Sequence, residues 1–352
     1  MDPFVLLTPL PEEPAPLALD AVAFAHLPAM QALSGVSAVA VALSGGPDSM
    51  ALAALTQEWA QERGIAVHMI TVDHALRPES ATEALRVGDW VGQHLSGVTH
   101  RVLRRDAALI TPTKLQEQAR HDRYRLMADE CRARGIAHLL LAHHQDDQAE
   151  TFLFRLCKGS GLDGLAGMNS QSAMHIDPKK GVTLVRPLLG VDKGRLVATC
   201  QARALPFVSD PSNTNDKFAR VRLRRVMSAL GREGLTVRRL AVTALRLGRA
   251  RAALEYYAEA AWVDAVVSQS DCDVLFDLTK LSAVPEDIRV RVLARALAQV
   301  GGDQGYGPRL EQVEELGAVL FEQAGFTRTT LHHCLVENSS ARKTLRITRE
   351  KP

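Results

Sequence analysis

The chain has 352 residues, of which 46% are hydrophobic and 23% are charged, and its formal net charge is +2. No apolar run reaches the roughly 18 residues that a membrane-spanning helix needs, and the N-terminus, which lacks a basic stretch, is not expected to be a signal peptide. The five cysteines are scattered without a CxxC pair, which argues against a metal or iron–sulfur site and predicts reduced thiols in the cytoplasm.

Two domains are expected, because a single hydrophobic core stops growing at about 250–300 residues. Strand and helix patterns alternate after a proline-rich leader that ends in a short helix at 18–33. Strands are expected at 36–43, 65–73, 98–103, 137–142 and 182–185, and helices at 50–63, 80–95, 114–134 and 193–204. This alternation predicts an α/β fold with a parallel, doubly wound sheet, in which ligands bind at the carboxyl ends of the strands.

A turn of small residues follows the first expected strand. It consists of Ser44, Gly45, Gly46, Pro47, Asp48 and Ser49. Glycines let a phosphate approach the backbone, and the helix that follows offers free amide donors and the positive end of its dipole. The turn therefore predicts an anion site, with an ordinary tight turn as the alternative.

Asp48 puts a carboxylate beside that anion, which is repulsive unless a cation lies between them. The residue therefore argues for a bridging Mg²⁺ ion. No lysine follows the glycines, so the turn is not the GxxxxGK[ST] loop that holds β- and γ-phosphates. It suits a pyrophosphate that leaves as one group, with the chemistry at the α-phosphorus.

A polar segment at 143–151 follows the strand expected at 137–142. It contains His143, Asp147 and Glu150, and the two acids stand three residues apart, as in a capping box. The two histidines and two aspartates of the segment can also bind a metal, although no ligand pattern such as HExxH is present. The polar groups outnumber those that a cap needs, which favours a turn that faces a substrate.

A basic run lies between positions 217 and 251, with eleven Lys or Arg residues and one acid. Solvated helix faces usually mix the two signs, so this imbalance favours contact with an RNA backbone. The candidate RNA-binding residues are Arg77, Lys217, Arg220, Arg222, Arg224 and Arg225.

The remainder of the chain reads as a smaller, mostly helical domain. Helices are expected at 236–269, 287–300 and 310–321, a strand at 274–277, and a hairpin or strand pair at 329–348. We therefore expect a leader at 1–33, an ATP-binding catalytic domain at 34–220 and a helical, RNA-contacting region at 221–352.

Together these segments resemble a known family. The turn at 44–49 matches the SGGxDS signature of the PP-loop, or N-type, ATP pyrophosphatases, whose fold is adenine nucleotide alpha hydrolase-like. Within that superfamily the chain resembles the tRNA(Ile)-lysidine synthases. The other matching segments are 72–80 (VDHALRPES), 119–124 (ARHDRY), 142–151 (AHHQDDQAET), 158–168 (KGSGLDGLAGM), 186–189 (RPLL) and 210–213 (DPSN). The chain departs from the family pattern at Ala75, where glycine is usual, at Lys158, where arginine is usual, and at 219–222 (ARVR), where RNRxR is common.

The resemblance implies an ATP-dependent carbon–nitrogen ligase. ATP would adenylate the wobble cytidine of an isoleucine tRNA with a CAU anticodon at C2, and L-lysine would displace AMP, which changes the codon that is read from AUG to AUA. The turn at 44–49 would bind ATP, and Asp48 with Mg²⁺ would neutralise the departing pyrophosphate. The other candidate catalytic residues are Arg120, Arg123, His143, Asp147 and Glu150.

In that scheme Asp147 and Glu150, with His143 alongside, orient the lysine ammonium and accept its proton. Either Arg120 or Arg123 stabilises the activated intermediate. We also expect a homodimer. The alternatives are a PP-loop tRNA thiolase, which needs a cysteine pair or cluster ligands near its ATP site, an ammonia-dependent synthetase, and a nucleotide-binding RNA module without catalysis.

Overall fold

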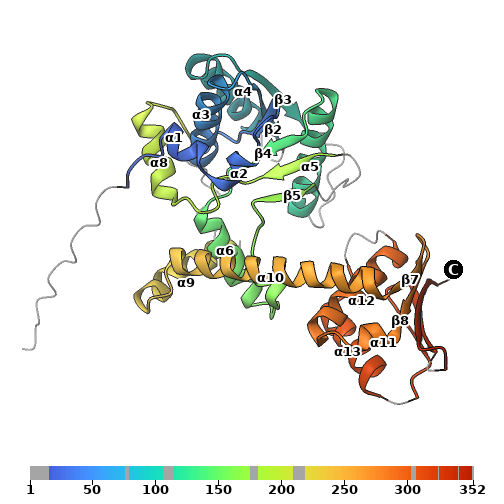
Figure 1. Cartoon of the computed structure of the whole chain (residues 1–352). Coiled ribbons are helices and arrows are strands. Elements are labelled where there is room, and N and C mark those ends of the chain that lie inside the picture. The colour runs from blue at the N-terminus through green and yellow to red at the C-terminus, as the bar shows by residue number, and fades with distance from the viewer. Residues whose placement is uncertain are drawn as a thin grey trace, which may run out of the picture. The chain divides into compact units, whose positions relative to one another are not determined.

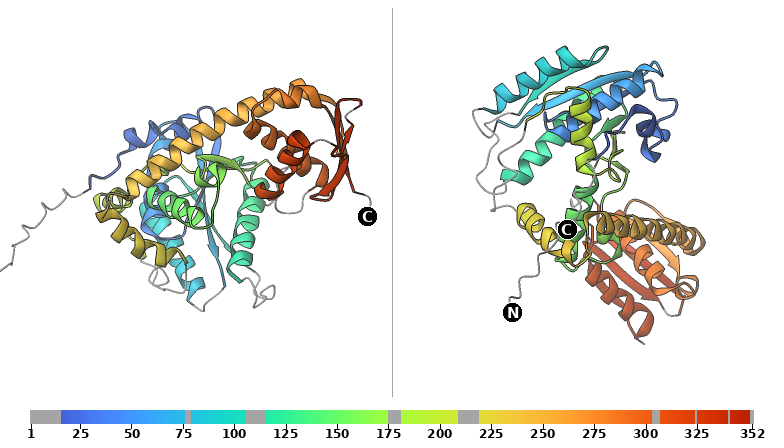
Figure 2. Two further views of the ribbon diagram at one scale, coloured as in Figure 1. Left: turned by 90° about the horizontal axis from the view of Figure 1, so that it is seen from below. Right: turned by 90° about the vertical axis from the view of Figure 1, so that its left-hand side faces the viewer.

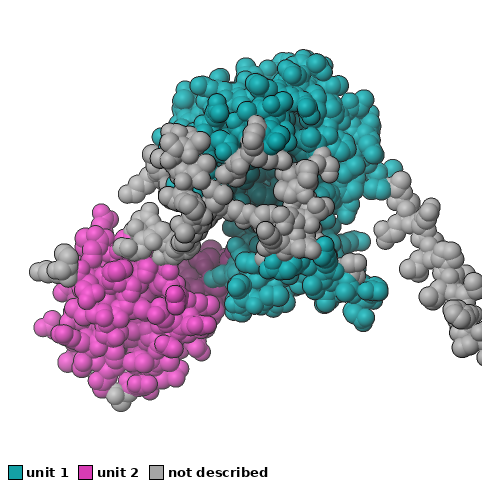
Figure 3. Space-filling view, turned by 180° about the vertical axis from the view of Figure 1, so that it is seen from behind, with its two compact units in different colours: residues 1–246 teal, residues 247–352 magenta. Residues whose placement is uncertain are grey.

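The computed structural model of the chain describes residues 16–75, 79–105, 115–174, 181–208, 219–302, 307–323, 325–339 and 341–350. The chain forms two compact units, Met1–Arg246 and Leu247–Pro352 (Figure 3). The boundary between them falls inside helix α10 (Val237–Ala265). No helix within these described ranges is long and apolar enough to cross a membrane.

The first unit is built on a six-stranded sheet with the strand order β3-β2-β1-β4-β6-β5 (Figure 1). The parallel strands are β1 (Ala38–Ala42), β2 (Ala66–Asp73), β3 (Thr99–Arg104), β4 (His138–Leu140) and β6 (Thr183–Val185), which confirms the predicted fold class. The edge strand β5 (Gln171–Ala173) pairs antiparallel with β6 and was not predicted. The strand order reverses between β1 and β4, so the carboxyl ends of these two strands form a switch point at which α/β sheets bind ligands.

Helices cover both faces of this sheet (Figure 2). On one face Val39 and Val41 pack with α3 (Pro47–Gln61), α4 (Ser80–His94) and α8 (Lys193–Ala202). On the other face Ala40 and Ile70 pack with α5 (Leu115–Ala133). Because successive strand residues point to opposite faces and both faces are covered, the central strand is apolar along its whole length.

Residues 16–33 pack into the core of the first unit. Leu19, Phe24, Met30 and Leu33 are all buried there. The single helix expected at 18–33 is wrong, because the structure has two short helices, α1 (Ala21–Ala25) and α2 (Pro28–Gln31). Pro28 explains the break, since a residue before proline is pushed out of the helical conformation and Leu27 is extended.

Three further helices complete the surroundings of the switch point. They are α6 (Gln145–Leu156), which follows β4, the short α7 (Leu162–Leu165) and the basic α9 (Ala219–Arg232). Helix α6 packs against both α7 and α9. The basic run therefore lies beside the helix that carries the polar segment at 143–151.

The second unit combines helices with a five-stranded antiparallel sheet, only part of which was predicted. Its strands, in sheet order, are β7 (Val266–Gln269), β8 (Asp273–Asp277), β11 (Thr344–Arg349), β10 (Cys334–Ser339) and β9 (Arg328–Leu331). Its helices after α10 are α11 (Leu278–Ser282), α12 (Glu286–Gly301) and α13 (Leu310–Glu322). Alternate strand residues such as Val274 and Phe276 are buried against the helices. The helix expected at 236–269 ends at Ala265, and its last four residues form β7 instead.

Candidate active site

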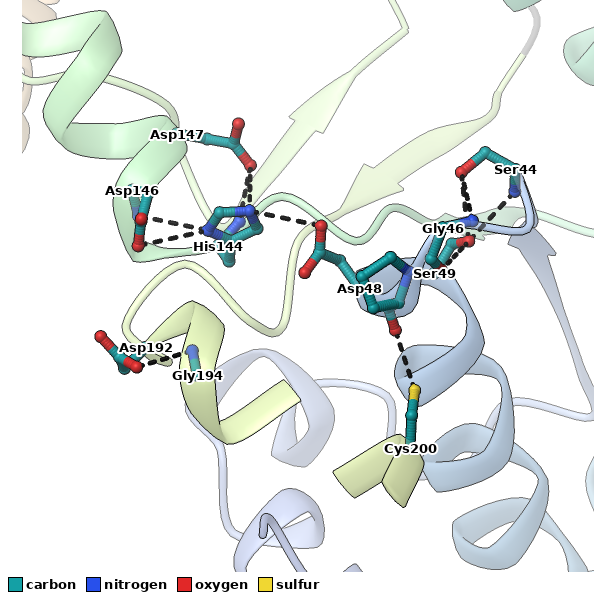
Figure 4. Close-up of polar contacts among 11 residues, drawn as sticks. Ser44, Gly46, Asp48, Ser49, His144, Asp146, Asp147, Asp192, Gly194 and Cys200 are labelled. Carbon is teal, nitrogen blue, oxygen red and sulfur yellow. Dashed lines mark hydrogen bonds and ion pairs between the residues drawn. The ribbon is translucent and has the colours of Figure 1, made fainter. Parts of the chain in front are cut away.

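The turn between β1 and α3 is held by hydrogen bonds of Ser44 and Ser49 (Figure 4) and contains Gly45 in the left-handed conformation. The Ser44 amide donates to Ser49 Oγ over 3.1 Å, and Ser49 Oγ lies 3.0 Å from the carbonyl oxygen of Gly46. Gly45 has a φ of +82°, and a Cβ there would lie 2.6 Å from Val87 Cγ2. The turn therefore has a shape that glycine adopts at position 45 without the strain that a side chain would bring.

The first turn of α3 is open to an anion. Gly46 is the N-cap residue and forms no side-chain cap, and Pro47 occupies the first turn. The amides of Asp48 and Ser49 have no intrahelical acceptor at this end of the helix, and the helix dipole adds positive charge. This geometry suits a phosphate group, as the sequence predicted.

Asp48 lies at the start of α3, and its two carboxylate oxygens have different surroundings. Its Oδ2 lies 3.5 Å from His144 Nε2, while its Oδ1 is buried without a hydrogen-bond partner among the described residues. A buried carboxylate oxygen beside a phosphate-binding turn fits Mg²⁺, which is commonly held by one or two carboxylates and by substrate phosphates. In the part of the chain that the structure describes, no group of three or more His, Cys, Asp or Glu residues could hold a metal.

Helix α6 begins with a capping box formed by His144 and Asp147. The His144 amide donates to Asp147 Oδ2 over 3.0 Å, and the Asp146 amide lies 3.3 Å from His144 Nδ1. His144 Nε2 lies 3.5 Å from both Asp48 Oδ2 and Asp147 Oδ2. This histidine therefore connects the start of α6 to the turn before α3.

The His144 ring is almost completely buried among three carboxylates. Burial lowers the pKa of His144, but hydrogen bonds to Asp146 and Asp48 and the charge of Asp147 outweigh it and raise the pKa to about 10. Both nitrogens of the protonated ring are donors, and Nδ1 lies 3.6 Å from Asp146 Oδ1. Nδ1 can accept from the Asp146 amide only when the ring is neutral. In the protonated ring the cap rests on the bond from the His144 amide to Asp147 Oδ2.

A cavity of about 480 Å³ opens beside the start of α6. This volume is within the range of roughly 300–1,000 Å³ that is typical of small-molecule sites. The cavity is lined by His144, Asp146, Glu150, Lys193, Met227, Gly231, Thr236 and Val237. It thus combines two carboxylates, two basic side chains and an apolar wall.

The candidates of the polar segment divide between the helix cap and the cavity. Glu150 is buried and lines the cavity, whereas Asp147 is engaged in the cap and His143 is not among the cavity-lining residues. Sequence reasoning missed His144, Asp146 and Lys193. The first two belong to the segment that was singled out, but no sequence signal links Lys193 to it. A hydrogen bond of 3.0 Å from the Gln145 amide to the Val191 carbonyl brings the start of α8 to this place.

Arg120 and Arg123, on α5, both stack on one aromatic ring. Their Cζ atoms lie 5.0 Å and 5.4 Å from the centroid of Tyr124. Arg120 is exposed, and Arg123 is half-buried with a buried Nε that lacks a hydrogen-bond partner in the described ranges. Neither residue lines the cavity.

The RNA-binding candidates are only partly visible. Arg77 and Lys217 lie outside the described residues, as does the segment at 210–213. Arg220 and Arg224 belong to α9, and the side chains of Arg222 and Arg225 on the same helix are exposed. Helix α9 also contributes Met227 and Gly231 to the cavity wall.

Known proteins resemble this chain over most of its length. The PP-loop domain family matches residues 21–230. The tRNA(Ile)-lysidine synthase of Methylobacterium nodulans is 46% identical over 79% of both chains, and that of Bradyrhizobium sp. is 41% identical over 76% of this chain and 75% of its own. The U34-tRNA thiolase NcsA of Methanococcus maripaludis, solved with its [4Fe-4S] cluster, aligns with a TM-score of 0.51 over 64% of this chain and 76% of its own, at 16% identity. That last likeness shows the fold alone.

Proposed function

The chain belongs to the tRNA(Ile)-lysidine synthase family of PP-loop proteins, and we therefore propose that it joins L-lysine to the wobble cytidine of an isoleucine tRNA with a CAU anticodon, using ATP. The observation that carries this proposal is the position of His144. It contacts Asp48 beside the phosphate-binding turn and also lines the cavity with Glu150. One buried ring thus joins a site for ATP to a site for an amine.

In the first step the C2 oxygen of cytidine attacks the α-phosphorus of ATP, and pyrophosphate leaves. The turn at 44–49 holds the departing phosphates through its amides and the dipole of α3. Asp48 is suited to hold a Mg²⁺ ion together with phosphate oxygens, and that ion would supply charge neutralisation. The adenylate formed on C2 is a far better leaving group than the original carbonyl oxygen.

In the second step the ε-amine of lysine attacks C2, and AMP leaves with the former C2 oxygen. An ammonium group is not a nucleophile, so a base must take its proton. Glu150 supports this role because it is buried and lines the cavity. Asp147 supports it indirectly, since it holds His144 and the start of α6 in place.

Arg120 or Arg123 would stabilise the activated cytidine. Substituting each arginine in turn and measuring adenylation of the tRNA identifies which one does so. The catalytic role falls to residues 34–220, and residues 221–352 would contact the tRNA. The exposed Arg222 and Arg225 support that contact, together with Arg77, Lys217, Arg220 and Arg224 by sequence. A cytoplasmic location and a homodimer belong to the same proposal, and light scattering tests the dimer.

A thiolase reaction is the alternative, and the Methanococcus maripaludis thiolase of similar fold was solved with a [4Fe-4S] cluster. The described cysteines are all free, and no metal-binding group of His, Cys, Asp and Glu forms among the described residues. The lysine reaction is the one that we test, because the chain is 46% identical to a lysidine synthase and only 16% identical to the thiolase.

The experiment supplies ATP, labelled L-lysine and an isoleucine tRNA transcript with a CAU anticodon. Wild-type protein is expected to incorporate one lysine for each AMP released, and a transcript with uridine at the wobble position should accept none. In Glu150→Gln, pyrophosphate release should persist while lysine transfer falls by about 10²-fold or more. ATP turnover that is independent of lysine and tRNA would contradict the proposal.

A further inference from the structure

The cavity beside α6 contains one cationic side chain that the reaction scheme has not used. Lys193 is the first residue of α8, and it is half-buried. Its backbone is held in place because Asp192 caps α8 by accepting from the Gly194 amide over 2.7 Å, and because Val191 is hydrogen-bonded to Gln145 at the start of α6. The ammonium of Lys193 is thereby brought to the same cavity as Asp146 and Glu150.

Lys193 is available to a ligand. No hydrogen bond or ion pair engages its side chain within the described residues, although two carboxylates line the same cavity. A half-buried ammonium that lacks a partner has lost part of its hydration without compensation. An anionic group of a ligand would restore that loss with a charge-assisted hydrogen bond.

The other lining residues restrict the chemistry of that ligand. Asp146 and Glu150 repel a phosphate chain, so the ATP phosphates belong at the turn before α3 and not here. The same carboxylates attract ammonium groups. Met227 and Val237 supply apolar contact suited to a methylene chain.

L-Lysine has this combination of groups, with one carboxylate, two ammonium groups and four methylenes between its ends. Resting on the proposed function, we propose that Lys193 binds the α-carboxylate of the substrate lysine, while Asp146 and Glu150 balance its two ammonium groups. Lys193 would then discriminate the amino acid from simple amines. It acts in substrate binding and takes no part in the adenylation of the tRNA.

The test compares L-lysine with L-lysinamide, which keeps both amines and lacks the negative charge. Steady-state lysine transfer to the tRNA gives the KM for lysine and the inhibition constant of lysinamide. The variants are Lys193→Met, Lys193→Gln as a second neutral substitution, and Lys193→Arg, which keeps the charge. Arg195→Met is the matched control, because it removes a positive charge from the same helix outside the cavity lining.

We expect Lys193→Met and Lys193→Gln to raise the KM for lysine about 10- to 100-fold, which is the worth of one charge-assisted hydrogen bond. The inhibition constant of lysinamide should change by no more than about twofold, because lysinamide has no carboxylate that Lys193 could bind. Lys193→Arg should retain most of the affinity, and Arg195→Met should behave as the wild type. Pyrophosphate release in the absence of lysine should be the same in all proteins.

Three results would overturn the assignment. They are an unchanged KM for lysine in both neutral variants, an equal loss of affinity for lysine and lysinamide, and a rise in the KM for ATP in place of that for lysine. The last result would assign Lys193 to a phosphate. If the proposed function itself is wrong, the wild-type protein will transfer no lysine to the tRNA. That result is distinct from the three results above.

Discussion

Helices α3 and α6 follow the neighbouring parallel strands β1 and β4, yet their N-termini are built in opposite ways. The start of α3 has no side-chain cap. The start of α6 is closed by a capping box and carries Asp146 and Asp147 in its first turn. Both helices present the same backbone amides and the same dipole to one edge of the sheet.

The difference indicates that side chains adapt similar helix N-termini to different ligands. The uncapped end of α3 is suited to a phosphate with a cation beside Asp48, whereas the capped end of α6, with two carboxylates in its first turn, disfavours an anion and suits an amine. Asp48 and His144 meet between the two ends at 3.5 Å. Substitutions at either end can therefore test this difference.

The largest effect is expected from Asp48→Asn at the open end. It removes the only acidic charge of the first turn of α3 and the carboxylate that is suited to Mg²⁺. The rate of tRNA-dependent pyrophosphate release should fall by about 10²–10³-fold, the typical loss on removing one electrostatic group from a reaction centre. Asp89→Asn, on the exposed side of α4, is the control. A rate within threefold of the wild type would refute the role of Asp48.

Gly45→Ala should deform the same turn. Alanine at a φ of +82° is strained, and its Cβ would lie 2.6 Å from Val87 Cγ2, so the free energy of unfolding should fall by about 1–3 kcal/mol. Gly46→Ala is the matched control, because Gly46 has an ordinary φ of −74° and the nearest atom to its Cβ would be Ser44 Oγ at 3.6 Å. Urea unfolding should separate the two variants. Equal stabilities would mean that Gly45 does not adopt the left-handed conformation.

The contrast between the two helix ends was only half predictable from sequence. The open end is a local feature, since Gly45, Gly46 and Pro47 have strong backbone preferences and follow an apolar strand. The parallel sheet was predictable for the same reason, because its strands and helices alternate with clear apolar patterns.

The arrangement at the start of α6 depends on the directions of side chains and on contacts between segments that are distant in the sequence, which a sequence pattern does not reveal. The spacing of Asp147 and Glu150 fits a cap as well as a site, and only the structure divides them between those tasks. Lys193 reaches the cavity through a hydrogen bond between Gln145 and Val191 that no pattern signals. Strand β5 has only three residues, Gln171–Ala173, and neither a β-branched nor an aromatic side chain, so local propensity does not mark it as a strand.

The charge of His144 gives the closed end its own pH dependence. Its pKa is about 10 in the folded chain against an ordinary value of 6.5, because the carboxylates of Asp146, Asp48 and Asp147 outweigh the effect of burial. A raised pKa stabilises the fold fully below pH 6.5, and that contribution is lost as the pH rises towards 10. The free energy of unfolding, measured in EDTA without ATP, should therefore decline over this range.

His144→Asn provides the comparison for that decline. Asparagine can still cap a helix, but it does not titrate, so the variant should show a flatter dependence of unfolding free energy on pH. Because other groups also titrate in this range, the difference between the two proteins is the quantity to measure. Parallel curves for the two proteins would show that the ring is neutral in the fold.

The smallest effect is expected at a third strand end on the same edge of the sheet. Asp73, the last residue of β2, is fully engaged, since its Oδ1 accepts from the Ala75 amide over 2.9 Å and from Ser80 Oγ over 2.5 Å. This closure places Ala75 at a φ of +52°. Ala75→Gly should raise the free energy of unfolding by about 0.5–1 kcal/mol, because the strain of a left-handed alanine exceeds the extra entropy of unfolded glycine. Ala66→Gly, on an exposed position of the same strand, should lower it by a similar amount. Equal losses in both variants would mean that Ala75 is not strained.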